Sequence, residues 1–233
     1  MSNVTTDQEK IREQVREGYG QIAEESGSSC CGPKTACCGG VRTPDALAAK
    51  LGYDEAELAV LPEGANLGLS CGNPTAMATL KEGEVVVDLG SGGGFDVFIA
   101  GRKVGAAGRA IGVDMTPEMI AKARKNMASY HDATGLDNVE FRLGEIEHLP
   151  VADNSTDAII SNCVINLSPD KAQVWRDMFR VLKPGGRVAV SDIALLKPLP
   201  EAVMELVDSR VGCLSGAVLR EETARMVEAA GFV

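Results

Sequence analysis

Cysteine is the residue type that first suggests chemistry, because a chain of 233 residues folds without needing covalent crosslinks. The seven cysteines form two adjacent pairs, Cys30-Cys31 and Cys37-Cys38, and three single positions, Cys71, Cys163 and Cys213. An odd count with adjacent pairs argues against a framework of structural disulfides. Thiolates are soft ligands and redox-active groups. The sequence therefore predicts thiols that act as ligands or in redox steps.

A glycine-rich turn is the second chemical feature. The apolar run at 85–89 leads into Gly90-Ser-Gly-Gly-Gly94 and then into a helical pattern. Such glycines allow positive φ and a close approach of a ligand to the backbone, although any tight strand-to-helix turn also uses them. Asp114 ends the next strand, where it could accept hydrogen bonds from ribose hydroxyls. Asp88, before the glycines, would repel a pyrophosphate but could hold an ammonium group. Together these residues predict a site for an adenosine-type cofactor.

The elements that must position these groups alternate between strand and helix. Strands are expected at 85–89, 110–114, 139–142, 156–161 and 186–192. Helical patterns cover 7–25, 46–51, 117 to about 135, and a segment opened by Ser168-Pro169 and stopped at 183–186. This alternation predicts an α/β fold with a doubly wound, Rossmann-like parallel sheet.

Three regions are expected along the chain. Residues 1–75 hold a helix, the cysteine-rich loop and a substrate-capture segment, residues 76–200 form the cofactor-binding core, and residues 201–233 form a helical segment at the substrate site. Folds of this type usually continue into two further, antiparallel edge strands after this point, so we expect the sheet to be cut short at 229–233.

Composition excludes several classes of partner. The net charge of −10 disfavours nucleic acid. No run approaches the about 18 apolar residues of a membrane helix, and the N-terminus lacks a signal peptide. The sequence predicts a cytosolic protein with no membrane or nucleic-acid partner.

Four motifs resemble, in their order, the class I S-adenosylmethionine-dependent methyltransferases over residues 76–192. They are Asp88-Leu-Gly-Ser-Gly-Gly-Gly94, Asp114-Met115, Gly144-Glu-Ile146 and Leu182-Lys-Pro-Gly-Gly186. The resemblance implies that the cofactor is S-adenosylmethionine. By that likeness Asp88, Gly90 and Gly92 border its methionine part, and Ser91 belongs to the cofactor set. The same likeness gives Asp114 and Met115 to the ribose and adenine, Glu145 and Ile146 to the adenine edge, and Asn162 to the cofactor set.

The end of the fourth strand should face the reacting centre. Enzymes that methylate amino groups of nucleic acids carry Asn/Asp-Pro-Pro-aromatic there, whereas this chain has Ser161-Asn-Cys-Val-Ile-Asn-Leu167. His131 and His148 fit surface positions better than a general base. A lone cysteine is more often a small buried hydrophobe. Three cysteines near one pocket instead suit a trivalent, thiophilic centre that keeps a lone pair, such as As(III).

The chain resembles the arsenite S-adenosylmethionine methyltransferases from the Tyr19-Gly20 helix to Cys213. The motifs that carry the resemblance are the two cysteine pairs, Leu67-Gly-Leu-Ser-Cys-Gly-Asn-Pro74, 87–96, Asn162-Cys-Val-Ile-Asn-Leu167 and Gly212-Cys-Leu-Ser-Gly-Ala217. The resemblance implies that Cys71, Cys163 and Cys213 are the catalytic thiols that hold As(III). It also implies that a thiol among Cys30, Cys31, Cys37 and Cys38 captures arsenite or its thiol conjugate, and that Tyr19 covers the cofactor.

Methyl transfer to thiolate-bound arsenic needs positioning and dehydration rather than a general base. Methylation formally oxidises As(III), so turnover should need an external thiol reductant, glutathione or thioredoxin, and could pass through a protein disulfide.

Three alternatives stay open. The loop at 30–38 could hold structural zinc, although adjacent cysteines suit tetrahedral geometry poorly. The chain could be a thiol-based metalloid sensor on a methyltransferase fold. It could also methylate carbon or oxygen of a small molecule, as the ubiquinone/menaquinone methyltransferases do, but those lack this cysteine set.

Overall fold

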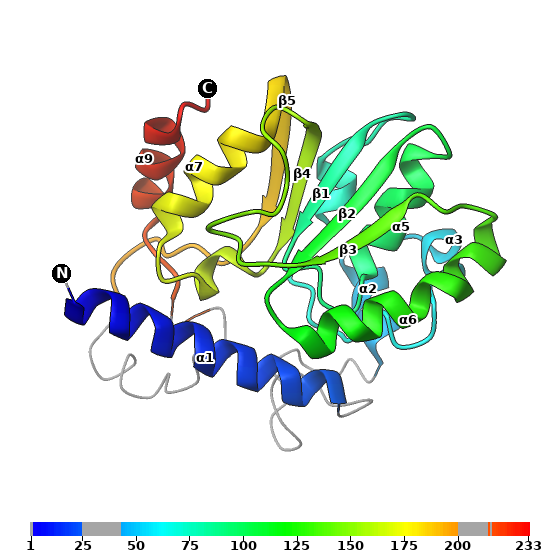
Figure 1. Ribbon diagram of the computed structural model, residues 1–233, viewed down its shortest axis with the longest axis horizontal. Coiled ribbons are helices and arrows are strands. Elements are labelled where there is room, and N and C mark those ends of the chain that lie inside the picture. The colour runs from blue at the N-terminus through cyan, green and yellow to red at the C-terminus, as the bar shows by residue number, and fades with distance from the viewer. Residues whose placement is uncertain (1, 25–42, 200–213, 215) are drawn as a thin grey trace.

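The computed structural model describes residues 2–24, 43–199, 214 and 216–233 (Figure 1). The predictions made for Cys30, Cys31, Cys37, Cys38 and Cys213 lie outside the described residues. The zinc alternative for 30–38 lies outside them as well.

A five-stranded parallel sheet forms the centre of the molecule, in the order β3-β2-β1-β4-β5. The strands are β1 (Val85–Leu89), β2 (Arg109–Asp114), β3 (Val139–Leu143), β4 (Thr156–Asn162) and β5 (Leu182–Ser191). The doubly wound fold predicted from the sequence is confirmed. Because the strand order reverses beside β1, the carboxyl ends of β1 and β4 open onto the crevice where folds of this class bind ligands.

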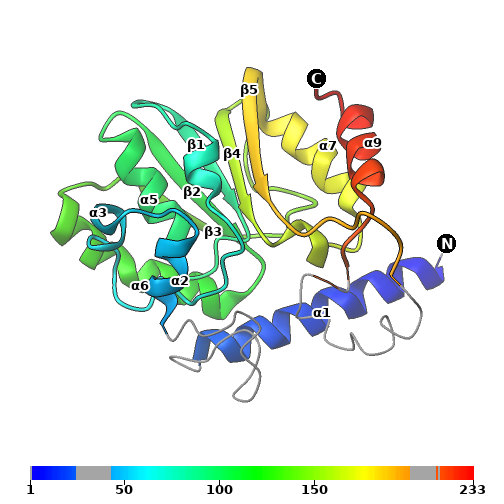
Figure 2. The same ribbon diagram turned by 180° about the vertical axis from the view of Figure 1, so that it is seen from behind.

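Helices cover both faces of the sheet, which explains why the central strands are apolar without alternation. The helices α5 (Phe95–Val104) and α6 (Pro117–Thr134) pack with Val86 on one face. On the other face α7 (Lys171–Val181) packs with Val87 and Leu89, and α9 (Arg220–Ala230) contributes Met226 to the same cluster. Figure 2 shows α9 lying outside α7.

The N-terminal helix α1 (Ser2–Glu24) runs across the carboxyl-end edge of the sheet (Figure 1). Its residues Ile22 and Ala23 pack on Met119 of α6. The shorter elements α2 (Pro44–Lys50), α3 (Glu55–Leu58), α4 (Pro74–Met77) and the 3-10 turn η1 (Ile165–Leu167) complete the described chain. Among the described helices, none is long and apolar enough to cross a membrane.

Two predicted boundaries were wrong. The strand expected at 186–192 begins at Leu182, so the segment 183–186, which does follow the end of α7 at Val181, lies inside β5. The pairing shifts from Thr156 with Leu182 to Ala158 with Arg187, and the extra residues bulge out. Helix α7 begins at Lys171 rather than at Ser168-Pro169, because the Asp170 carboxylate accepts the Gln173 N–H at 3.0 Å and caps it there.

Candidate active site

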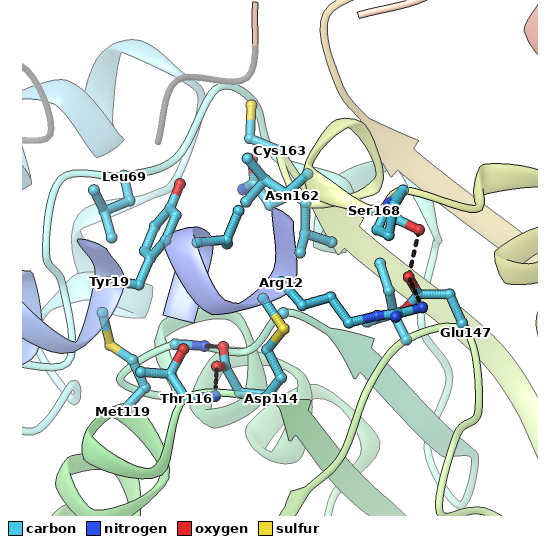
Figure 3. Close-up of a pocket in the computed structure, with 18 residues that line it drawn as sticks. Arg12, Tyr19, Leu69, Asp114, Thr116, Met119, Glu147, Asn162, Cys163 and Ser168 are labelled. Atoms are coloured by element: carbon cyan, nitrogen blue, oxygen red, sulfur yellow. Dashed lines mark hydrogen bonds and ion pairs between the residues drawn. The ribbon is translucent and has the colours of Figure 1, made fainter. Parts of the chain in front are cut away.

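A cavity of about 730 Å³, counting its mouth, lies at the carboxyl ends of the strands (Figure 3). Its floor is the glycine turn after β1 and the end of β2, and one wall is the end of β4. Helix α1 closes it with Arg12, Val15 and Tyr19. In Figure 3, Tyr19 and Leu69 lie on one side of the cavity, and Arg12, Glu147 and Ser168 lie on the other.

The turn after β1 requires glycine for reasons of space and conformation. Gly90 has φ of 67°, and a Cβ there would come within 2.7 Å of Val164 Cβ. The Gly90 and Ser91 N–H groups both donate to the Val113 carbonyl, at 2.8 and 3.1 Å. The backbone is therefore fixed, and the cavity floor is bare of side chains at Gly90.

Asp114 joins this turn to the end of β2. Its Oδ2 accepts the Gly92 N–H at 2.9 Å and its Oδ1 accepts the Thr116 N–H at 2.8 Å. Burial raises the pKa of Asp114, and these hydrogen bonds partly oppose the rise. Each carboxylate oxygen keeps a further lone pair, so Asp114 can still accept a ligand hydroxyl.

A second hollow, of about 440 Å³, shares Leu69, Gly90, Gly92 and Asn162 with the first and adds Asp88 and Asp96 to the lining. Burial raises the pKa of Asp88 well above its usual range, with further contributions from Asp96 and Asp114. Burial also raises the pKa of Asp96 to about 6, against hydrogen bonds from Tyr53 and Asn162.

These buried carboxylates lack cationic partners in the part of the chain that the structure describes. Among the described residues, no lysine or arginine forms an ion pair with Asp88, Asp96 or Asp114. The Ser91 hydroxyl, which lines the same hollow, has no hydrogen-bond partner within the described chain either. A positively charged ligand with hydrogen-bonding groups fits this donor and acceptor set.

Two of the three predicted thiol residues come together beside the cavity. Cys71 and Cys163 are joined as a disulfide, with a Cα–Cα distance of 6.1 Å. Cys163 is buried and lines the larger cavity, whereas Cys71 is exposed. Cys163 has φ of 55° and donates its N–H to the Ser191 carbonyl at 2.8 Å, which holds the start of the loop after β4 against β5. The site therefore places Cys163 in the wall of the cavity, with the Cys71 sulfur bonded to it from outside the lining.

The third predicted thiol, Cys213, lies outside the described residues, but Leu214 and the chain from Gly216 onward are described. Gly216 packs directly against the Asn166 carbonyl, and a Cβ at position 216 would lie 3.0 Å from the Asn166 carbonyl carbon. Asn166 in turn donates its amide to Asp192 Oδ1 and to the Ile193 carbonyl, both at 2.7 Å. Gly216 thus lies close to the loop that carries Cys163.

Most of the predicted cofactor residues line one of the two hollows. Tyr19, Met115 and Ile146 line the larger one, together with Asn162. Glu145 does not, because its carboxylate turns to Arg12 Nε at 3.3 Å and to Arg16 at 3.7 Å.

Among the lining residues missed from the sequence, Arg12, Glu147 and Ser168 form one hydrogen-bonded group. Glu147 is buried and accepts the Ser168 hydroxyl at 2.8 Å and Arg12 Nη2 at 3.4 Å. Sequence reasoning missed Arg12 because it is one of many charged residues on an amphipathic helix. It missed Glu147 and Ser168 because they belong to no cofactor motif. Within the described residues, no group of three or more histidine, cysteine, aspartate or glutamate side chains could hold a metal ion.

Comparison with known proteins gives concordant results. Residues 80–231 match the family described as "Methyltransferase domain". The chain is 51% identical, over 97% of its length, to an arsenite methyltransferase of Halobacterium salinarum, and 36% identical, over 95%, to an arsenite methyltransferase of Aquipseudomonas alcaligenes.

A solved structure agrees with these sequence relatives. The crystal structure of an arsenic(III) S-adenosylmethionine methyltransferase from Chlamydomonas reinhardtii superposes with a TM-score of 0.65 at 37% identity, over 79% of this chain and 61% of that one. The chain spans 58% and 62% of the two curated relatives. With the sheet order and the glycine turn, the match over 80–231 shows that this chain belongs to the methyltransferase domain family.

Proposed function

We propose that this protein transfers a methyl group from S-adenosylmethionine to trivalent arsenic held by cysteine thiolates. The observation that carries the proposal is the pairing of Cys71 with Cys163 at the wall of the cavity above the glycine turn. Soft thiolates bind As(III), and a class I methyltransferase fold offers its cofactor crevice at this edge of the sheet. The similarity to arsenite methyltransferases over nearly the whole chain supports the same substrate.

The residues present suit the donor. S-adenosylmethionine supplies an electrophilic methyl group on a positively charged sulfonium. Asp88, buried and without a cationic partner in the described chain, would face the positively charged methionine part, and Gly90 lines the same hollow. Asp114 would accept the ribose hydroxyls, and Met115 and Ile146 would pack on the adenine. Tyr19 of α1 would exclude water from above.

Cys71 and Cys163 would hold the substrate arsenic once their disulfide is reduced. Their Cα atoms are close enough for both sulfurs to reach one atom. Cys213 would supply the third thiolate. As(III) bound by three thiolates keeps its lone pair, so the protein needs only to align that pair with the methyl group and exclude water. A thiol among Cys30, Cys31, Cys37 and Cys38 would receive arsenite, or its glutathione conjugate, first.

The observed disulfide suggests how turnover is completed. Methyl transfer raises arsenic formally from As(III) to As(V), and two electrons return it to As(III). Cys71 and Cys163 can supply both electrons by forming their disulfide. Glutathione or thioredoxin would then reduce the disulfide by thiol exchange, which suits a reaction in the cytosol.

The test is to incubate the reduced protein with arsenite, glutathione and methyl-labelled S-adenosylmethionine, and to separate the arsenic species. We expect labelled methylarsenicals with the wild type and none with Cys163→Ser, while both bind the cofactor. Cofactor binding without methylarsenicals in the wild type would favour a metalloid sensor. Label in a small quinone precursor, with none in arsenic, would favour a carbon or oxygen methyltransferase.

A further inference from the structure

A buried polar network behind Cys71 has no role in the proposal so far. The network begins at Tyr53, which lies between α2 and α3 and is only 3% exposed. The Tyr53 ring packs edge-on against Phe95, with 4.8 Å between ring centroids, in a cluster with Ala48 and Ile99. This packing holds the Tyr53 ring in place. Its hydroxyl donates to Asp96 Oδ1 at 2.7 Å and lies 3.1 Å from the Gly72 carbonyl oxygen.

Asp96 fixes the orientation of the next member, Asn162. An ionised carboxylate only accepts hydrogen bonds, so the Asn162 amide must present its nitrogen to Asp96 Oδ2, at 3.1 Å. The same nitrogen donates to the Gly72 carbonyl at 2.9 Å. The amide oxygen therefore faces the opposite way, where it accepts the Cys71 N–H at 3.0 Å.

The network thus holds the backbone on both sides of the Cys71–Gly72 peptide group. Asn162 directly precedes Cys163 in the chain, so one amide side chain ties the Cys71 backbone to the strand end that carries the other thiol. We propose that Tyr53 and Asp96 are positioning residues that act through Asn162 and hold the Cys71 thiol close enough to Cys163 for both to bind one arsenic atom. This inference rests on the proposed function. Neither residue would touch arsenic.

Tyr53 is the residue to change, because it lines neither hollow. Tyr53→Phe keeps the packed ring and removes only the hydroxyl. The readout is the equilibrium in which the two thiols and one oxidised glutathione give the Cys71–Cys163 disulfide and two reduced glutathiones. Isotope-coded alkylation and peptide mass spectrometry measure this pair specifically in the full chain. The equilibrium constant reports how well the thiols are held together and needs neither arsenite nor methyl transfer.

Tyr130→Phe is a matched control, since that phenol is equally buried and donates to Asn138 Oδ1 at 3.0 Å, away from the cysteines. We expect Tyr53→Phe to lower the equilibrium constant about fivefold, the effect of one lost hydrogen bond, and Tyr130→Phe to leave it unchanged. Arsenite should bind Tyr53→Phe more weakly by a similar factor, and S-adenosylhomocysteine equally well.

Asp96→Leu, which leaves the Asn162 amide free to turn, should lower the constant further. The inference is overturned by a wild-type constant in Tyr53→Phe, or by an equal fall in Tyr130→Phe. These outcomes leave the proposed function untouched, whereas a wild type that forms the disulfide but never methylates arsenite contradicts the function and not this inference.

Discussion

Asp88, Asp96 and Asp114 are buried at the ligand crevice, and none has a cationic partner among the described residues. Burial is the largest cause of the raised pKa of each. In the absence of ligand, ionisation of these carboxyls therefore costs folding free energy. This cost of keeping the three carboxyls ionised is consistent with a site in which a bound cation balances their charge.

The pH dependence of stability should show this cost at Asp96. Its pKa rises from 3.8 to about 6 on folding, so its contribution to stability is full below pH about 4 and is lost as the pH rises through about 6. Asp96→Asn should remove a difference on the order of 2 kcal/mol between pH 4 and pH 7. Urea unfolding in excess reductant measures it. An unchanged difference between the two pH values would show that Asp96 titrates normally.

Glycine at position 90 should be needed for cofactor binding as well as for stability. Gly90 and Gly83 both have positive φ, 67° and 84°, but a Cβ at Gly83 would meet nothing within 4 Å. Gly83→Ala should cost about 1 kcal/mol of unfolding free energy and leave cofactor affinity unchanged. Gly90→Ala should cost more and weaken S-adenosylmethionine binding at least tenfold by calorimetry. Equal behaviour of the two variants would contradict the close approach at the turn.

At the scale of elements, α1 lies over the cavity and is held by charge as well as by apolar contacts. Arg12 reaches from α1 to Glu145 and Glu147 on the loop after β3. Its side chain is only 13% exposed, so these ion pairs are better shielded from salt than the pairs within the helix. The ion pairs of Arg12 therefore tie the cover of the cavity to its wall.

Replacing Arg12 should loosen the cover of the cavity. Arg12→Met keeps the aliphatic stem and should weaken S-adenosylmethionine binding about fivefold, because it removes the partly buried ion pairs with Glu145 and Glu147. Lys10→Met is the control, because Lys10 is 66% exposed and its ion pair in the described part of the chain is within the helix, with Asp7. Equal affinity in Arg12→Met and the wild type would mean that α1 does not contribute to binding.

The elements and the glycine turn could be predicted because their signals are local. Buried parallel strands such as 85–89 are apolar runs, here interrupted only by Asp88, and the turn is marked by its glycines. The bulge at 183–186 depends on how β5 pairs with β4, so it could not be predicted from the local sequence. Tyr53 and Asn162 are separated from Asp96 by 43 and 66 residues along the chain, so spacing alone did not reveal their network.

At the scale of the whole molecule, the reversal of strand order brings the glycine turn beside the Asn162-Cys163 strand end. This arrangement requires the edge strand β5 to stay in register with β4, and Arg187 helps to hold β5 in place. Its guanidinium donates to both oxygens of Glu84, at 2.8 and 2.7 Å, and to the Thr79 carbonyl at 3.0 Å. This clamp ties the chain before β1 to β5.

Arg187→Met should therefore destabilise the whole fold by about 1–2 kcal/mol at pH 7. The hydrogen bond from Arg187 is the main cause of the lowered pKa of Glu84, so this stability is present above pH 4.5 and is lost as the pH falls through the lower pKa of the folded protein. The loss in Arg187→Met should shrink at pH 3. Arg220→Met, at an arginine that is 71% exposed, should change little, and an equal loss in both variants would contradict the clamp.

The most direct test of the central claim is a single turnover. Reduced protein is loaded with one equivalent of arsenite, mixed with a substoichiometric amount of methyl-labelled S-adenosylmethionine, and quenched rapidly. If the cavity and the Cys71–Cys163 pair form one methyl-transfer site, the label moves from the cofactor to arsenic in the wild type without a lag, and stays on the cofactor in Cys163→Ser. Label that remains on bound cofactor in the arsenite-loaded wild type, or that reaches arsenic equally in Cys163→Ser, would contradict it.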